Sequence, residues 1–112
     1  MNKKSRTSNK RWQQYNFLVD EVCGKLSPTE SIVLLAAFRH GRKEGYFRVS
    51  AMRLSRSVGL TKRTVQRTLS KLEHVGAIKT VRPQLGTTPK TYRIQIIETD
   101  SGYSMPLLRG DI

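Results

Sequence analysis

The sequence is poor in acidic residues, in cysteine and in long apolar runs. Its 112 residues hold 8 Asp and Glu against 21 Lys and Arg, which gives a formal net charge of +13. The single cysteine, Cys23, excludes an internal disulfide, and a lone thiol of this kind is typical of a small buried side chain. The longest apolar run, Ile32–Phe38, has seven residues, whereas a membrane span needs roughly 20. We therefore expect a cytoplasmic protein that does not contact membranes.

Patterns that carry catalysis are missing as well. The only two histidines, His40 and His74, are not spaced as metal ligands and do not lie near Cys23 in the sequence. No glycine-rich loop is followed by the Lys-Ser or Lys-Thr pair that cradles phosphates. The sequence thus predicts a protein that is not an enzyme and that uses no cofactor and no metal.

The positive charge is distributed unevenly along the chain. Residues 1–19 contain five basic residues and no acid, and residues 45–72 contain seven more, again without an acid. Such a surface favours a polyanionic partner, because nucleic acid releases counterions when Lys and Arg neutralise its phosphates. We expect a flexible basic arm over 1–10, one domain over 11–97 and a slightly acidic C-terminal tail over 98–112.

Two helices are expected in the first part of the domain. Apolar residues from Trp12 to Leu26 recur every three or four positions, which predicts a helix over about 10–25. Ser27-Pro28-Thr29-Glu30 then forms a capping-box sequence that opens a second helix, which runs to about Arg39. A polar loop over 40–45 and a short strand over 46–49 follow.

A second pair of helices gives the most informative pattern. Ser50 can cap a helix over 51–58 that Gly59 ends, with Met52, Leu54 and Val58 as its inner positions. Thr61 can cap the next helix, which carries Val65, Leu69 and Leu72 on one face before Gly76. Two helices joined by such a short glycine-containing turn are typical of a helix-turn-helix, whose second helix enters the major groove of DNA.

A β-hairpin is expected directly after these helices. Residues 77–81 and 91–96 alternate apolar and polar side chains, and the turn-rich loop 82–90 lies between them. The predicted fold is therefore α+β and mainly α, a winged helix-turn-helix of about four helices and a C-terminal β-hairpin wing.

The stretch LSPTESIVLLAAFRHG, followed by YFRVSAMRLSRSVGLTKRTVQRTLSKLEHVGAIKT, resembles the N-terminal domain of the phage replication protein O family. It is also similar to multiple-antibiotic-resistance-type regulators and to small plasmid-encoded control proteins. The resemblance implies a winged helix DNA-binding protein of the bacterial plasmid or phage type. Only residues 98–112 stand where replication proteins of that kind carry a helicase-recruiting segment, which favours a stand-alone DNA-binding protein.

These observations predict a sequence-specific binder of double-stranded DNA, most simply a small transcriptional repressor encoded by a plasmid or other mobile element. It would work in the bacterial cytoplasm, associated with the nucleoid or the plasmid. Side chains of the helix that begins after Thr61 would face bases and phosphates. Ser50 and Thr61 would cap the two helices of the pair, and residues of the wing loop would add contacts. The predicted DNA-binding residues are Ser50, Thr61, Lys62, Arg63, Thr64, Gln66, Arg67, Ser70, Lys71, Arg82 and Lys90.

Several alternatives stay open at this point. The protein could be a replication or partition factor that binds repeated origin sites and assembles with other replication or partition proteins. RNA binding is a third interpretation, although the aromatic residues mostly fall on apolar stripes and predict no exposed stacking platform. The helix over 10–25 is the expected element of a homodimer, unless Trp12 folds back onto its own domain. The basic arm is either disordered or inserts into a minor groove.

Overall fold

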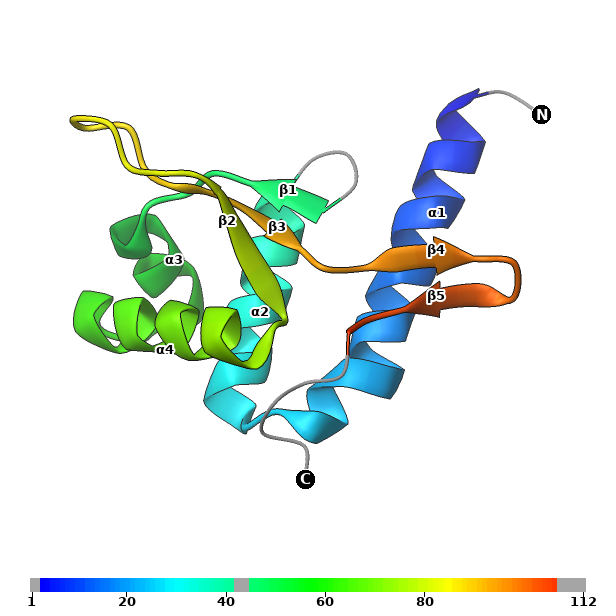
Figure 1. Ribbon diagram of the computed structural model, residues 1–112, viewed down its shortest axis with the longest axis horizontal. Coiled ribbons are helices and arrows are strands. Elements are labelled where there is room, and N and C mark those ends of the chain that lie inside the picture. The colour runs from blue at the N-terminus through cyan, green and yellow to red at the C-terminus, as the bar shows by residue number, and fades with distance from the viewer. Residues whose placement is uncertain (1–2, 42–44, 107–112) are drawn as a thin grey trace.

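The computed structural model of the chain describes residues 3–41 and 45–106 (Figure 1). This part of the chain contains four α-helices and five short β-strands; the helices and the β2–β3 hairpin confirm the predicted winged helix-turn-helix, and β4 and β5 are additional. The α-helices are α1 (Lys3–Phe17), α2 (Pro28–His40), α3 (Ala51–Val58) and α4 (Lys62–Val75). The strands are β1 (Tyr46–Phe47), β2 (Ile78–Arg82), β3 (Thr91–Ile94), β4 (Ile97–Thr99) and β5 (Gly102–Ser104).

The strands form two separate antiparallel sheets. β3 lies between β1 and β2, and the β2–β3 pair is the predicted hairpin of the wing. The register shifts between Thr80 and Arg82, so that Val81 interrupts the regular pairing and is exposed. Such a bulge increases the local twist of a strand, here at the base of the wing loop. β4 and β5 form a second, two-stranded hairpin.

One apolar core joins α2, α3, α4 and the three-stranded sheet. α2 begins at the predicted capping box, in which Ser27 Oγ accepts from Glu30 N and Glu30 Oε1 accepts from Ser27 N. Burial of the apolar faces, rather than helix propensity, supplies most of the stability of such short helices. The fully buried side chains that centre the core are Leu18, Val33, Leu34, Leu54, Val65, Leu72, Ile78 and Ile94.

The N-terminal helix begins earlier than the predicted helix over 10–25. α1 begins at Lys3, and it continues through a π-helical turn at Leu18–Val22 and a 3₁₀ turn at Cys23–Lys25. No glycine or proline precedes Gly24, so nothing in this basic sequence stops a helix. From Lys3 onward the backbone of the expected arm is helical; residues 1–2 lie outside the described part.

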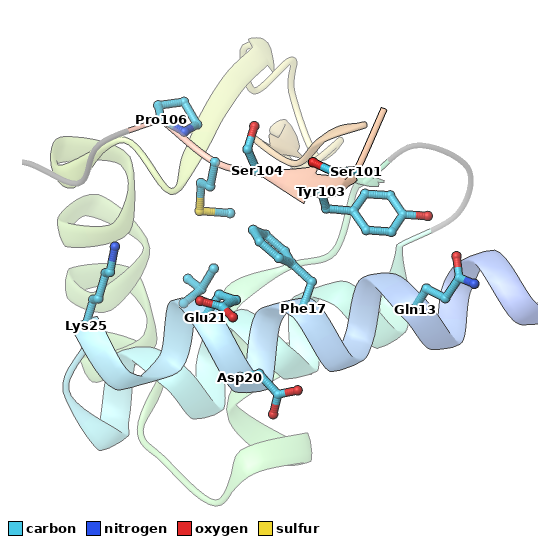
Figure 2. A pocket seen from close by; sticks show the side chains of 11 residues that line it. Gln13, Phe17, Asp20, Glu21, Lys25, Ser101, Tyr103, Ser104 and Pro106 are labelled. Carbon is cyan, nitrogen blue, oxygen red and sulfur yellow. The ribbon is translucent and has the colours of Figure 1, made fainter. Parts of the chain in front are cut away.

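The expected C-terminal tail over 98–112 contains the second hairpin. Phe17 of α1 and Tyr103 of β5 both line a cavity of about 590 Å³ (Figure 2). Their rings contact each other in a tilted arrangement, with centroids 6.1 Å apart. Met105, just after β5, packs against the apolar core. The Phe17–Tyr103 contact and the Lys10–Glu98 ion pair join the hairpin to α1. Residues 107–112 lie outside the described part of the chain.

Not every apolar residue of the predicted stripes is buried. Leu18 and Val22 reach the core as expected, but Trp12 is 63% exposed, and Tyr15 and Val19 are exposed as well. Met52, an expected inner position of α3, is exposed too. Trp12 and Tyr15 lie outside the core and line a shallow cavity with Leu35 and Ala36 of α2.

Candidate nucleic-acid interface

The turn between α3 and α4 fixes the geometry of the two helices. Gly59 ends α3 in the left-handed conformation with φ 71°, and the amides of Gly59 and Leu60 both donate to the carbonyl of Ser55. Thr61 then caps α4, because its Oγ1 accepts from Thr64 N at 3.1 Å. Three residues, Gly59, Leu60 and Thr61, thus join the two helices, and their hydrogen bonds partner backbone groups at both helix ends.

The inner face of α4 decides which face points outward. Val65, Leu69 and Leu72 are buried, as the sequence predicts. Thr68 is buried beside them, and its hydroxyl donates to the carbonyl of Thr64 at 2.7 Å. Because the hydroxyl is hydrogen-bonded, its burial costs little folding free energy. Because this face is committed to the core, α4 cannot rotate without exposing it.

Six of the predicted DNA-binding residues form one exposed face of α4, and we call this set the recognition face. All six side chains are exposed, and none is acidic. Arg and Gln can pair with guanine and adenine edges, and Lys, Arg and Ser can contact phosphates. The recognition face consists of Lys62, Arg63, Gln66, Arg67, Ser70 and Lys71.

Three other predicted residues are occupied within the protein. Ser50 caps α3, with its Oγ accepting from Arg53 N at 3.1 Å. The hydroxyl of Thr61 donates to Thr64 Oγ1 at 2.9 Å, and Thr64 itself is only half-exposed. These hydroxyls form hydrogen bonds at the starts of α3 and α4. They therefore have less capacity left for hydrogen bonds to DNA.

The wing carries the last two predicted residues. Arg82 at the end of β2 and Lys90 just before β3 are both exposed. Arg93, in contrast, lies in the middle of the sheet with its guanidinium over the ring of Tyr46, 5.5 Å from the ring centroid. Its Nε is buried and has no hydrogen-bond partner within the described residues, so Arg93 is a part of the sheet rather than of the wing surface.

Sequence reasoning missed a basic groove between α3 and the wing. This cavity, of about 730 Å³, is lined by three arginines, Arg48, Arg53 and Arg82, together with residues of β1 and β3. The signal for it was present, since Arg48 and Arg53 fall in the stretch 45–72 that lacks acids. The groove extends the positive surface from α3 to the base of the wing.

His40 lies at the edge of this groove. It is the last residue of α2 rather than a loop residue, and its Nε2 lies 3.3 Å from Ser57 Oγ of α3. Partial burial lowers the pKa of His40 below its ordinary value of 6.5, and the neighbouring charges of Arg53 and Arg39 lower it further. The imidazole therefore favours its neutral form and links α2 to α3.

An aromatic pair is exposed outside this surface, contrary to the expectation that no such platform exists. The rings of Trp12 and Tyr15 stack with their centroids 5.5 Å apart on α1. They border a shallow, mainly apolar cavity of about 520 Å³ that is also lined by Leu35 and Ala36 of α2. The pair was hidden in the sequence because it falls on the apolar stripe of the helix.

The described residues contain no cluster of three or more His, Cys, Asp or Glu side chains that could hold a metal ion. None of the helices in that part of the chain is long and apolar enough to cross a membrane.

Comparison with protein families agrees with this geometry. Residues 24–78 match a family model described as a helix-turn-helix domain. The matched segment is thus similar to a helix-turn-helix domain. The matched segment runs from the end of the N-terminal helix to the first residue of β2, so it includes α2, α3, α4 and the whole recognition face. No curated protein and no solved structure matches the chain.

The helix-turn-helix match supports DNA as the partner of this protein. The wing with Arg82 and Lys90 lies beyond the matched segment, as does nearly all of α1. Support for DNA as the partner therefore comes from the segment that contains α3 and α4. The family match gives no information on the wing loop or on α1.

Proposed function

We propose that this protein binds double-stranded DNA in a sequence-specific manner and acts as a small transcriptional repressor of a plasmid or other mobile element. The observation that carries the proposal is the recognition face of α4, six exposed polar side chains opposite the buried stripe of Val65, Leu69 and Leu72. A repressor acts by occupying its operator, and the recognition face supplies side chains that can contact base edges and phosphates.

Each part of the basic surface has a distinct role in this proposal. Arg63, Gln66 and Arg67 read base edges in the major groove, while Lys62, Ser70 and Lys71 contact phosphates. Thr64 is half-exposed, and the exposed part of its side chain adds to the base contacts. The arginine groove beside α3 and the wing residues Arg82 and Lys90 neutralise the adjacent backbone.

The test begins with selection of bound sites from random DNA by the full chain. Binding of the selected duplex by Arg63→Ala plus Arg67→Ala is then measured in a gel-shift titration. Each lost base contact should cost on the order of 1–3 kcal/mol and relax the base preference at its position. Lys62→Ala should instead weaken binding to all sequences alike and reduce the salt dependence by about one phosphate contact.

Lys25→Ala is the control for loss of a positive charge, because Lys25 is exposed in the 3₁₀ turn after α1 and lines the cavity beside Phe17 and Tyr103 rather than the recognition face. Unchanged operator affinity of the double variant would refute the role of α4. Footprinting then tests the biological role. One palindrome over a promoter supports a repressor, whereas an array of direct repeats would replace it by an origin-binding or partition factor.

We also propose that the protein binds its operator as a homodimer. One short recognition helix reads few base pairs, and two copies related by a two-fold axis read two half-sites. The exposed residues Trp12 and Tyr15 of α1, Val19 of the π-helical turn and Ile32 of α2 supply an apolar surface that is separate from the recognition face. This surface favours α1, together with α2, as the dimer element.

Sedimentation at micromolar concentration should show a dimer that Trp12→Ser dissociates. Ile97→Ser is the control, because Ile97 is an exposed aliphatic residue of β4. A wild-type protein that sediments only at the monomer mass of 12.8 kDa would refute the dimer.

A further inference from the structure

The tip of the wing carries an apolar side chain with no partner in the protein. Leu85 is 69% exposed, more than any other large hydrophobic residue in the described part of the chain. It lies in the loop between β2 and β3, which extends beyond the rest of the wing toward the side where α4 begins (Figure 1). A leucine in this place contributes nothing to the core.

The wing tip is built to hold Leu85 outward. Leu85 N donates to the carbonyl of Thr88 at 3.2 Å, and Thr88 N donates to the carbonyl of Leu85 at 2.9 Å. Gly86, with φ 57°, takes the left-handed conformation that a two-residue hairpin turn needs at this position. Two reciprocal backbone hydrogen bonds therefore close the turn and hold the backbone of Leu85 in place.

The residues around the turn add further restraint. Gln84 Nε2 donates to the carbonyl of Gly86 at 3.3 Å. Pro83 and Pro89 stand one residue outside the segment 84–88, and the ring of each proline fixes φ near −65°. A flexible loop would let the leucine fold back onto the hairpin, whereas this loop resists such a collapse.

The surroundings of Leu85 are basic. Residues 74–97 contain no Asp or Glu, and Arg82 and Lys90 stand on the two arms of the wing loop. An apolar tip between cationic arms matches the chemistry of a duplex minor groove, where basic side chains meet phosphates and an apolar side chain enters between base pairs. A hydrophobic protein surface would instead leave the two cations without partners.

We infer that Leu85 is a wedge that enters the minor groove beside the half-site, partly unstacks one base step and bends the DNA. The inference rests on the proposed DNA binding and adds a bending activity to it. Wedges of this kind kink a duplex by about 20–90°. Pyrimidine–purine steps such as TA and CA unstack most easily, so Leu85 makes the protein selective at a position that no hydrogen bond reads.

The experiment measures the bend of a duplex of the selected sequence, labelled at both ends for energy transfer and bound by the full chain. Wild-type protein should shorten the end-to-end distance by an amount that corresponds to a kink within about 20–90°. Leu85→Ala should leave the duplex nearly straight while retaining specific binding, and Leu85→Met should restore the bend. Ile97→Ala is the matched control, an exposed aliphatic residue on the other hairpin.

A second measurement locates the wedge. The fluorescence of 2-aminopurine placed at the candidate step should rise on binding of wild-type protein and stay low with Leu85→Ala. Selection from random DNA with Leu85→Ala should lose the preference for a pyrimidine–purine step and keep the preferences set by α4.

The outcomes separate this inference from the proposed function. Specific binding without a bend, or an equal bend with Leu85→Ala, would overturn the wedge and leave the role of α4 intact. Absence of specific DNA binding by the wild-type chain would overturn both. A bend that depends on Leu85 in a duplex whose affinity depends on Arg63 and Arg67 would support both.

Discussion

The turn of the helix-turn-helix offers the sharpest test of how this sequence encodes its fold. Gly59 lies at the C-terminal end of α3 with φ 71° and ψ 25°, a conformation that L-residues with a Cβ resist. A Cβ added at Gly59 would meet no other atom within 4 Å. The effect of Gly59→Ala is therefore a property of the backbone alone, free of steric clashes.

The magnitude follows from two opposing terms. The left-handed conformation costs a non-glycine residue roughly 1–2 kcal/mol. Alanine also restricts the unfolded chain, which offsets about 0.4–1 kcal/mol of this cost. The net loss in the free energy of unfolding is about 1 kcal/mol, which lowers the Tm of a domain of this size by about 4–8 °C.

Gly24→Ala is the matched control. A Cβ at Gly24 also meets nothing within 4 Å, but the backbone of Gly24 does not have the positive φ found at Gly59. Only the unfolded-state term acts there, and Gly24→Ala should stabilise the protein by about 0.4–1 kcal/mol. Urea and thermal unfolding followed by circular dichroism measure both variants. Equal stabilities of Gly59→Ala and Gly24→Ala would refute the reasoning.

Three further predictions concern α4, the core and His40. Thr61→Ala should lower the unfolding free energy by about 1 kcal/mol because the amide of Thr64 loses its cap, while Thr61→Ser should retain most of it in the same urea titration. Leu72→Ala empties a fully buried site and should cost about 2–5 kcal/mol, measured as a lower urea midpoint; a loss below 1 kcal/mol would contradict its central place in the core. Because the pKa of His40 is lowered in the folded state by burial and by nearby arginines, the unfolded chain binds its proton first, and stability should fall as the pH drops below 6.5. His40→Gln should weaken this pH dependence in unfolding curves recorded between about pH 5 and 7, and an unchanged dependence would contradict the shift.

The elements that could be predicted are those whose signals are local. Ser27 with Glu30, Ser50 and Thr61 each place a hydroxyl where a helix begins, and all three accept the expected backbone hydrogen bonds. Gly59 supplies the positive φ that ends α3. Caps and turns depend on a few neighbouring residues, so the boundaries of α2, α3 and α4 follow from the sequence within about one or two residues.

The elements that could not be predicted depend on distant contacts. β4 and β5 have three residues each, too short for an alternating pattern to stand out, and they are held by the packing of Tyr103 on Phe17. The exposure of Trp12 has the same origin, because periodicity shows that a stripe exists but not whether the core has room for it. The arginine groove needed the fold to bring β1, α3 and the wing together.

The acidic residues complete the electrostatic argument. Four of the eight acidic residues lie on two elements: Asp20 and Glu21 continue α1, and Glu98 and Asp100 belong to the second hairpin, where Glu98 forms an ion pair with Lys10 at 3.0 Å. These two elements lie on the side of the molecule away from the wing tip and from the start of α4 (Figure 1). Glu73 lies near the end of α4, outside the recognition face, and its carboxylate accepts from Thr80 N at 3.1 Å. The net charge of +13 is thus an average over a basic face and a mixed one. A DNA duplex attracts the basic face and gains less from the other, so the field orients the protein before contact as well as attracting it. The positions of the acidic residues therefore affect this orientation more than their small number does. The surface formed by α3, the recognition face of α4 and the wing loop is the part of the protein that a polyanion approaches first.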